Sequence, residues 1–160
     1  MVAGLVVAFT GAGPADAAVD ARTTVRVQVA SNVSITGYGI DSAIKLMNSK
    51  TTRTRLVRGR CTTGAARCIL VGIGVFAKAN RYGLAYPPTA TTAGFVRLAP
   101  KSKQLSGPLR KRLFLHELGH TRNLAHASSC NSVMFSWIVC HGRLVPYAFS
   151  AKERAILQRQ

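Results

Sequence analysis

The chain has 160 residues, which is enough for one domain with a sizeable hydrophobic core. Its 48% hydrophobic content excludes a largely disordered protein, and we expect no segment that spans a membrane. The net charge of +17 has two interpretations, a solvated Arg-rich surface or an attraction to nucleic acid or to an anionic wall or membrane. Because Arg and Lys are scattered along the chain, we favour the solvated surface.

The N-terminus has the pattern of a secretory targeting segment. An apolar run at residues 4–9 is too short to cross a bilayer, and Ala15-Asp16-Ala17 offers the small-x-small pattern at which signal peptides are cleaved. No Lys or Arg precedes the run, which indicates that the true start lies further upstream. We therefore predict a signal peptide at residues 1–17, truncated at its N-terminus, and a single catalytic domain at residues 18–160 of a secreted protein. The alternative is a buried first strand.

The middle of the chain alternates between strand and helix patterns. Residues 23–29 alternate apolar and polar side chains, and residues 53–60 form a second, polar strand pattern. Between them, residues 40–47 have apolar positions at helical spacing. Residues 68–76 are nearly all apolar, which suits a central strand covered on both faces.

The C-terminal half predicts one short strand and two helices. Residues 80–94 are rich in Gly, Pro and Thr and are expected to form a surface loop before a strand at residues 95–98. Ser106-Gly107-Pro108 begins a helix expected to end near residue 122, and Ser150 with Glu153 has the spacing of a capping box. The order of elements predicts an α+β fold.

Four cysteines fit an exported protein, because disulfides form in oxidising compartments. We favour two local disulfides, Cys61–Cys68 and Cys130–Cys140, among the three possible pairings. A zinc site made of thiolates is the alternative, but the chain has no C-x-x-C pair.

The segment HELGHTRNLAH, residues 116–126, contains three of the four histidines. Residues four apart share one helix face, so His116 and His120 can reach one metal ion, and Glu117 beside them can contact a water bound to it. In a straight helix His126 would face away, about 9 Å along the axis. Asn123 is suited to the left-handed conformation that ends a helix and would return His126 to the ion.

This segment resembles the metzincin signature H-E-x-x-H-x-x-G-x-x-H, with Asn123 in place of glycine. Residues 132–135, which contain Met134, look like the methionine turn that lies beneath the metal in metzincins. Residues 83–88 and 94–98 are similar to the loop and edge strand above the cleft of matrixin-like members. The resemblance implies a metzincin-like zincin domain with a small twisted mixed sheet, a backing helix, an active-site helix and a C-terminal helix.

The resemblance also implies a zinc-dependent endopeptidase that binds one catalytic Zn²⁺ through His116, His120 and His126. Glu117 would be the general base, acting on a water bound to the metal. The backbone of Gly94, Phe95, Val96, Arg97 and Leu98 would pair with an extended protein or peptide substrate. Trp137 would shape the side-chain pocket, although it could equally be a core residue.

Several family features are missing from the sequence. Ser136 occupies the position at which some metzincins have a tyrosine near the metal, and too few residues precede the first strand for a cysteine-bearing propeptide. Because the few carboxylates are widely spread, we expect no structural calcium.

Two other functions remain open at this point. One is a secreted zinc-binding module without catalysis, and the other is a basic protein that binds polyanions. The basic surface could also hold the enzyme weakly at an anionic cell wall. We expect a monomer, and we interpret His141 as a surface residue rather than an alternative ligand.

Overall fold

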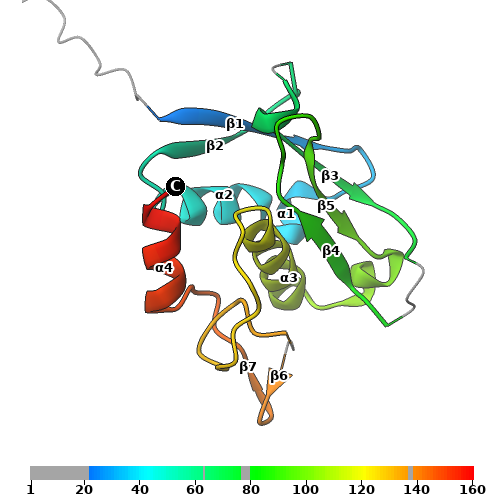
Figure 1. The fold of residues 1–160 in the computed structure, drawn as a ribbon. Coiled ribbons are helices and arrows are strands. Elements are labelled where there is room, and N and C mark those ends of the chain that lie inside the picture. The colour runs from blue at the N-terminus through cyan, green and yellow to red at the C-terminus, as the bar shows by residue number, and fades with distance from the viewer. Residues whose placement is uncertain (1–21, 63, 77–79, 137–138) are drawn as a thin grey trace, which may run out of the picture.

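The computed structural model describes residues 22–62, 64–76, 80–136 and 139–160 of the chain. The elements, in order, are β1 (Thr23–Val29), α1 (Ile35–Tyr38), α2 (Ile40–Asn48), β2 (Thr54–Arg58), the 3₁₀ turn η1 (Ala65–Arg67), β3 (Cys68–Ile73), β4 (Gly83–Tyr86), β5 (Gly94–Leu98), the 3₁₀ turn η2 (Pro100–Gln104), α3 (Gly107–His120), β6 (Val139–Cys140), β7 (Arg143–Leu144) and α4 (Ala151–Gln158). Figure 1 shows their arrangement.

Five strands form one mixed sheet in the order β2-β1-β3-β5-β4. The first four of these strands are parallel to their neighbours, and β4 pairs antiparallel with β5 at one edge. The short strands β6 and β7 form a separate hairpin. The helices lie on one side of the sheet, with α3 passing beneath β4 and β5 (Figure 1). This is the α+β class that the order of sequence patterns predicts.

The hydrophobic core lies between the sheet and its helices. Alternate residues of the strands, such as Val27, Ile69 and Val96, point inward and are fully or almost fully buried. On the helix side, Phe114 and Leu118 of α3 are completely buried in the same cluster. Helix α3 is therefore packed between the sheet and the segment that follows the helix. This packing fixes the positions of the residues near the C-terminal end of α3.

Most of the predicted elements are confirmed within one or two residues. The first strand, the two longer helices and the capping box of α4 are present where the patterns indicate them. One element was missed, because residues 80–94, expected as a loop, contain the edge strand β4. This strand has only four residues, and its pairing with β5 rather than its own pattern makes it a strand.

The apolar run that begins at Cys68 was expected to be covered on both faces, and this part of the prediction is wrong. Strand β3 is central in the sheet, but the helices cover only one of its faces. Leu70 points to the other face and is 43% exposed.

Within the described residues, no helix has both the length and the apolar character that a membrane crossing would require. The predicted signal peptide, residues 1–17, lies outside the described residues.

Candidate metal centre

Helix α3 carries the first two histidines of the motif close to its C-terminal end. Pro108 occupies the first turn, where its missing N–H costs no hydrogen bond, and the helix runs through to His120. Every residue from Arg112 to Gly119 is buried. Packing on both sides thus fixes the rotation of the helix and the direction in which His116 and His120 point.

The chain reverses at Asn123, as the sequence predicts. Asn123 has a φ of 55°, in the left-handed region, and the Leu124 N–H donates to the Gly119 carbonyl oxygen at 3.2 Å. This is the hydrogen-bonding pattern with which a left-handed residue ends a helix. The reversal brings His126 back toward the two histidines of α3.

The three imidazole rings converge through their Nε2 atoms. His120 Nε2 lies 3.1 Å from His116 Nε2 and 3.1 Å from His126 Nε2. All three ligand atoms lie within 4.8 Å of one another. Three nitrogens about 2.1 Å from one tetrahedral ion would be about 3.4 Å apart, so the spacing is close to that of a zinc site.

Backbone carbonyl groups fix the tautomers of two of these rings. His116 Nδ1 donates to the Val133 oxygen at 2.8 Å, and His120 Nδ1 donates to the Leu124 oxygen at 2.7 Å. A carbonyl oxygen only accepts, so both rings carry their proton on Nδ1 and present an unprotonated Nε2.

This arrangement fits a divalent cation. Nε2 lone pairs that face one another at 3.1 Å repel, since neither nitrogen has a proton to donate. Protonation does not relieve the contact, because burial lowers the pKa of His116 to about 3 and also lowers the pKa of His120. A cation between the rings would satisfy both of these lone pairs, and His126 Nε2, 3.1 Å from His120 Nε2, is placed to be a third ligand.

Glu117 lies beside the histidines, beneath the edge strand β4. Its side chain is buried and faces Gly83, where an added Cβ would lie 2.6 Å from the carboxyl carbon. Burial raises the pKa of Glu117 to about 8, and the positive charge of Arg81 acts in the opposite direction. Only a glycine at position 83 leaves room for this carboxyl group.

The segment below the histidines has the features expected of the methionine turn. Met134 is completely buried, and its sulfur lies against Gly119 of α3. The Met134 carbonyl accepts a hydrogen bond from the Ala127 N–H at 2.9 Å, just after His126. Because Val133 supplies the acceptor for His116, this turn contacts both the first and the third histidine segments.

Two buried polar groups, neither of them marked as functional by the sequence, hold this turn. Arg112 is buried, and its Nη2 donates to the carbonyl oxygens of Val133 at 3.3 Å and Phe135 at 3.1 Å. The buried carboxylate of Glu153 accepts from Ser132 Oγ at 2.6 Å, and Ser132 Oγ accepts from the Met134 N–H at 2.9 Å. Glu153 was expected only as a helix cap, and nothing in its local pattern indicates a second role.

The expected substrate strand does not lie at a free edge. Residues Gly94–Leu98 form β5, which pairs with β3 on one side and with β4 on the other. Its backbone is thus already hydrogen-bonded on both sides, and the expectation that it takes up a substrate strand is wrong. Strand β4 provides the edge instead. Trp137, assigned to the side-chain pocket, lies outside the described residues.

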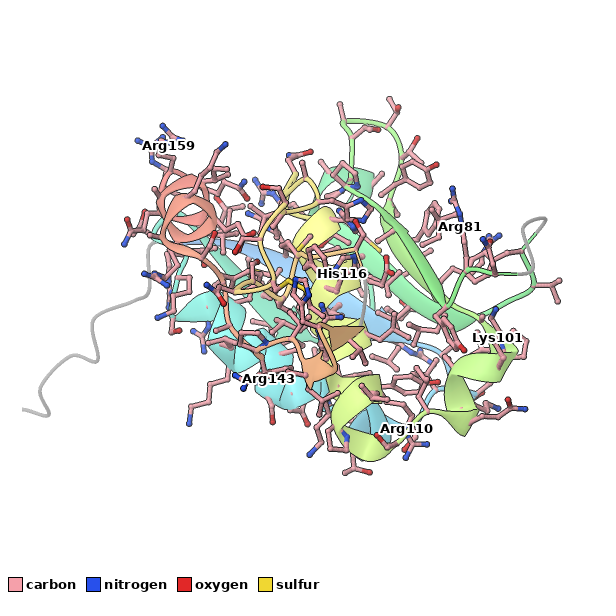
Figure 2. All side chains as sticks on the ribbon, turned by 90° about the horizontal axis from the view of Figure 1, so that it is seen from below. Arg81, Lys101, Arg110, His116, Arg143 and Arg159 are labelled. Carbon is pink, nitrogen blue, oxygen red and sulfur yellow. A yellow bond between two sulfur atoms is a disulfide. The ribbon has the colours of Figure 1, made fainter. Side chains whose placement is uncertain are left out.

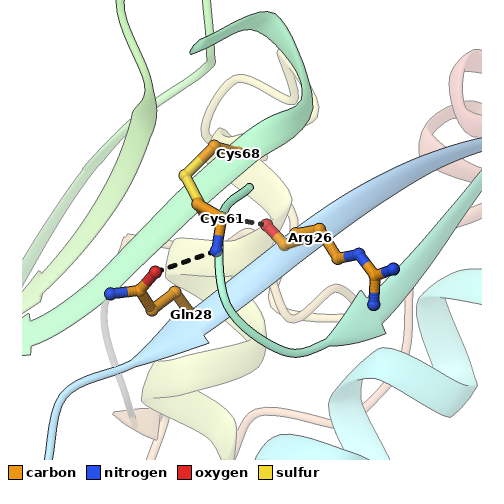
Figure 3. The surroundings of a disulfide bond; sticks show 4 residues. All are labelled: Arg26, Gln28, Cys61 and Cys68. Carbon is orange, nitrogen blue, oxygen red and sulfur yellow. Dashed lines mark hydrogen bonds between the residues drawn. A yellow bond between two sulfur atoms is a disulfide. The ribbon is translucent and has the colours of Figure 1, made fainter. Parts of the chain in front are cut away.

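Both expected disulfides are present. Cys61–Cys68 closes a loop beside β3, with Cα atoms 5.5 Å apart, and the Cys61 N–H donates to the Gln28 side-chain oxygen at 2.9 Å (Figure 3). Cys130–Cys140 connects the segment after His126 to the β6–β7 hairpin. His141 lies close to this second pair, but both sulfur atoms are engaged in the disulfide, so no thiolate is present to bind a metal there.

Basic side chains lie around His116 in the view of Figure 2. Figure 2 labels His116 near the middle of this view and, around it, Arg81, Lys101, Arg110, Arg143 and Arg159. The carboxylates in the described part of the chain lie on separate elements, and Asp41 of α2 is paired with Arg58 of β2 at 2.9 Å. The absence of a calcium site stays a prediction.

Neither the known family models nor the curated protein sequences match this chain at a significant level. The interpretation of the site therefore depends on the residues and geometry of this chain alone. They define an α+β protein with a three-histidine group that can hold one metal ion.

Proposed function

We propose that the protein is a secreted, zinc-dependent endopeptidase of the metzincin type. The observation that carries this proposal is the convergence of three imidazole Nε2 atoms within 4.8 Å of one another, two of them held unprotonated by the backbone bonds at Nδ1. Three nitrogen ligands leave the fourth position of a tetrahedral zinc ion for water or substrate, which is the arrangement of catalytic rather than structural sites.

The bound cation would supply a positive charge that acidifies a water molecule and polarises a peptide carbonyl group. Glu117 is the group of this chain that would accept the proton of the attacking water and return a proton to the leaving amine. Its burial beneath β4 supports this role, because a base that is shielded from bulk solvent transfers its proton to the reacting groups.

Strand β4 would bind the substrate. One side of its backbone pairs with β5, and the other side is the edge of the sheet. An extended peptide can add to such an edge through main-chain hydrogen bonds. Because Gly83 of β4 contacts Glu117, a peptide along this edge would pass directly over the proposed general base.

The Glu117→Gln variant tests catalysis. It should bind one zinc ion per chain and lose peptide hydrolysis by about a hundredfold or more, since the amide cannot accept the proton. Casein digestion by the purified protein, with and without chelator, and metal analysis of the same samples provide the measurement. Undiminished hydrolysis in this variant would exclude Glu117 from the mechanism.

The His126→Ala variant tests the ligand set. Loss of one of three ligands should weaken zinc affinity by at least about tenfold. His141→Ala is the matched control, because it removes an exposed histidine outside the triad and should leave the affinity unchanged. Equal effects of the two substitutions would contradict the proposed ligands.

The same measurements separate the two alternatives. A zinc-binding module without catalysis would bind the ion stoichiometrically and leave casein intact. A protein whose main role is to bind polyanions would show steeply salt-dependent binding that does not respond to the histidine substitutions. The two disulfides support an extracellular location in all three cases.

A further inference from the structure

The outer face of the five-stranded sheet is only partly covered in the described part of the chain. The loop closed by the Cys61–Cys68 disulfide lies over one part of it, where the outward-facing Cys68 is buried. Sheets made mainly of parallel strands are usually covered on both faces, because each strand is then apolar on both sides. Here the helices lie on one face only (Figure 1). On the other face Leu70 is 43% exposed and Tyr86 is 53% exposed. Exposed apolar side chains gathered on one face commonly mark an interaction site.

The strand register places four of these outward side chains in one row. Gln28 of β1 is opposite Leu70 of β3, Leu70 is opposite Phe95 of β5, and Phe95 is opposite Tyr86 of β4. The row therefore runs across four strands from a polar amide to two aromatic rings. The Phe95 and Tyr86 rings are in edge contact, with their centroids 5.1 Å apart.

A hollow of about 430 Å³ lies beside this row, lined among others by Gln28, Leu70, Gly72, Phe95 and Arg97. A second hollow of about 460 Å³ continues from Leu70 toward the loop closed by the Cys61–Cys68 disulfide. Because the two hollows share Gln28, Leu70 and Ala93, they form one trough across the face.

Gly72 at the floor of the trough is not required to be glycine by any neighbour in the described part of the chain. A Cβ at this position would meet no atom of the described residues within 4 Å, and its φ is not in the left-handed region. Glycine in the interior of a strand weakens the strand and often marks a place where a ligand approaches the backbone closely. The missing side chain leaves the trough open next to Arg97, which is opposite Gly72 in the register.

The charge on this face is positive. Arg26, Arg55 and Arg97 are outward positions of β1, β2 and β5, and no described Asp or Glu occupies an outward position on these five strands. The Arg97 guanidinium lies 5.4 Å from the centroid of the Phe95 ring, so the cation stands at the rim of the apolar row. An apolar floor with a cation at its rim is complementary to a ligand that has an apolar group beside an anionic one.

We propose that this trough is a docking site for an acidic polypeptide segment, with an apolar side chain seated over Gly72 and Leu70 and a flanking carboxylate paired with Arg97. Arginine binds carboxylates in bidentate geometry, and Tyr and Arg are enriched in the centres of protein interfaces. The site lies on the opposite face of the sheet from the histidines, so it does not depend on the proposed catalysis.

A polypeptide fits this face better than a nucleic acid. Single-stranded nucleic acids need several aromatic rings with open faces on which successive bases stack. Here Arg97 lies over the Phe95 ring and Tyr86 touches its edge, so the row offers no such series. The aliphatic floor formed by Leu70 and Ala93 suits a side chain rather than a phosphodiester.

The experiment measures the binding of a fluorescein-labelled peptide in which leucines are flanked by aspartates, by fluorescence anisotropy. The Glu117→Gln protein serves as the background, so that the probe is not hydrolysed. Three further probes are compared with it. Two are peptides, one with lysine in place of aspartate and one with serine in place of leucine, and the third is a single-stranded oligothymidylate of equal charge. We expect binding of the first probe to exceed that of each of the others by about tenfold or more.

Two pairs of variants test the location. Gly72→Val fills the trough without a clash and should lower the affinity for the peptide by about tenfold, with an unchanged or raised melting temperature. Thr24→Val on the same face is its control and should leave the affinity unchanged. Arg97→Glu should also lower the affinity by about tenfold, and Lys152→Glu on α4 by less than about twofold. Leu70→Asp, at an exposed position, should abolish binding and provides a second test of the floor.

Three results would overturn the proposal. Unchanged binding by Gly72→Val and Leu70→Asp would mean that the trough is not occupied. Equal losses of affinity in Arg97→Glu and Lys152→Glu would mean that binding depends on the overall charge of the protein and not on Arg97. Oligothymidylate binding as tight as that of the acidic peptide, with the same loss in Gly72→Val, would assign the face to nucleic acid.

Discussion

Gly83 of β4 lies directly against the carboxyl group of Glu117 on α3, so that a Cβ at position 83 would lie 2.6 Å from the Glu117 carboxyl carbon. The edge strand can thus lie against the proposed general base because position 83 has no side chain. A Gly83→Ala substitution should displace the carboxyl group and reduce peptide hydrolysis by about tenfold or more, because a small misplacement of a catalytic group is costly.

Zinc stoichiometry should remain one per chain in Gly83→Ala, since the three atoms nearest to a Cβ at this position all belong to Glu117 and none to a histidine. Steady-state hydrolysis of a peptide and metal analysis measure the two effects. Ala85→Val, in the same strand, is a control for general disturbance of β4. A loss of zinc that parallels the loss of activity would show that Gly83 acts through the fold and not through Glu117.

Asn123 tests the reversal that brings His126 to the site. Its φ of 55° is tolerated by Asn and Gly, while a β-branched residue there would cost about 1–2 kcal/mol. Asn123→Gly should therefore retain zinc affinity, and Asn123→Val should lower both the free energy of unfolding and the zinc affinity. Chemical denaturation and competition with a chromogenic chelator give the two quantities. Equal affinities of the two variants would mean that the left-handed turn does not hold His126.

The histidine site could be predicted from sequence because its geometry is local. His116 and His120 are four residues apart on one helix, and Asn123 has a conformational preference that is independent of the rest of the chain. The local sequence therefore predicts both the metal ligands and the turn that brings them together. The role of the Val133 carbonyl as the acceptor for His116 could not be predicted in the same way, because every residue type has a backbone carbonyl group.

The substrate edge was assigned to the wrong strand because pairing is not local. Residues 94–98 have a clear strand pattern, whereas Gly83–Tyr86 is short and lies among Gly and Pro residues. Which of two neighbouring strands occupies the edge is decided by the order of the sheet, and the periodicity of a strand does not report its neighbours. The partly exposed outer face escaped prediction for the same reason, since an apolar run such as residues 68–76 does not show what covers it.

Glu153 connects α4 to the turn that holds His116. Its carboxylate accepts hydrogen bonds from Ser132 Oγ and from the Ser150 N–H, each at 2.6 Å, while Ser150 Oγ caps the helix. Glu153→Ala should lower the free energy of unfolding by about 2–3 kcal/mol, because it leaves buried donors without their charged acceptor. Glu153→Gln should cost less, since the amide oxygen still accepts one bond.

The effect of Glu153 on the metal site separates a positioning role from simple stability. If the Ser132–Met134 turn orients His116, zinc affinity should fall in Glu153→Ala under conditions in which the protein is fully folded. Ser132→Ala should show the same loss, because it removes the group between Glu153 and the Met134 N–H. Unchanged affinity in both variants would limit Glu153 to stabilising α4.

The two buried groups of the site give the metal-free protein a defined pH dependence. Burial lowers the pKa of His116 from 6.5 to about 3, so the unfolded chain binds this proton more readily and stability is lost as the pH falls from 6.5 toward 3. Burial raises the pKa of Glu117 from 4.5 to about 8, so the folded protein retains this proton and stability is lost as the pH rises from 4.5 toward 8.

The contributions of His116 and Glu117 nearly cancel between pH 4.5 and 6.5, so stability in excess chelator should change there only through the lowered pKa of His120, rising with pH. It should fall below pH 4.5 and above pH 6.5. Each group contributes a limiting slope of about 1.4 kcal/mol per pH unit, and the lowered pKa of His120 adds to the acid side. Urea denaturation at a series of pH values measures the profile.

Glu117→Gln should remove the loss of stability between pH 6.5 and 8 and leave the loss at acid pH unchanged. Asp41→Asn, at an exposed carboxylate, is the control and should alter neither loss. A loss above pH 6.5 that persists in Glu117→Gln would show that another group titrates in that range.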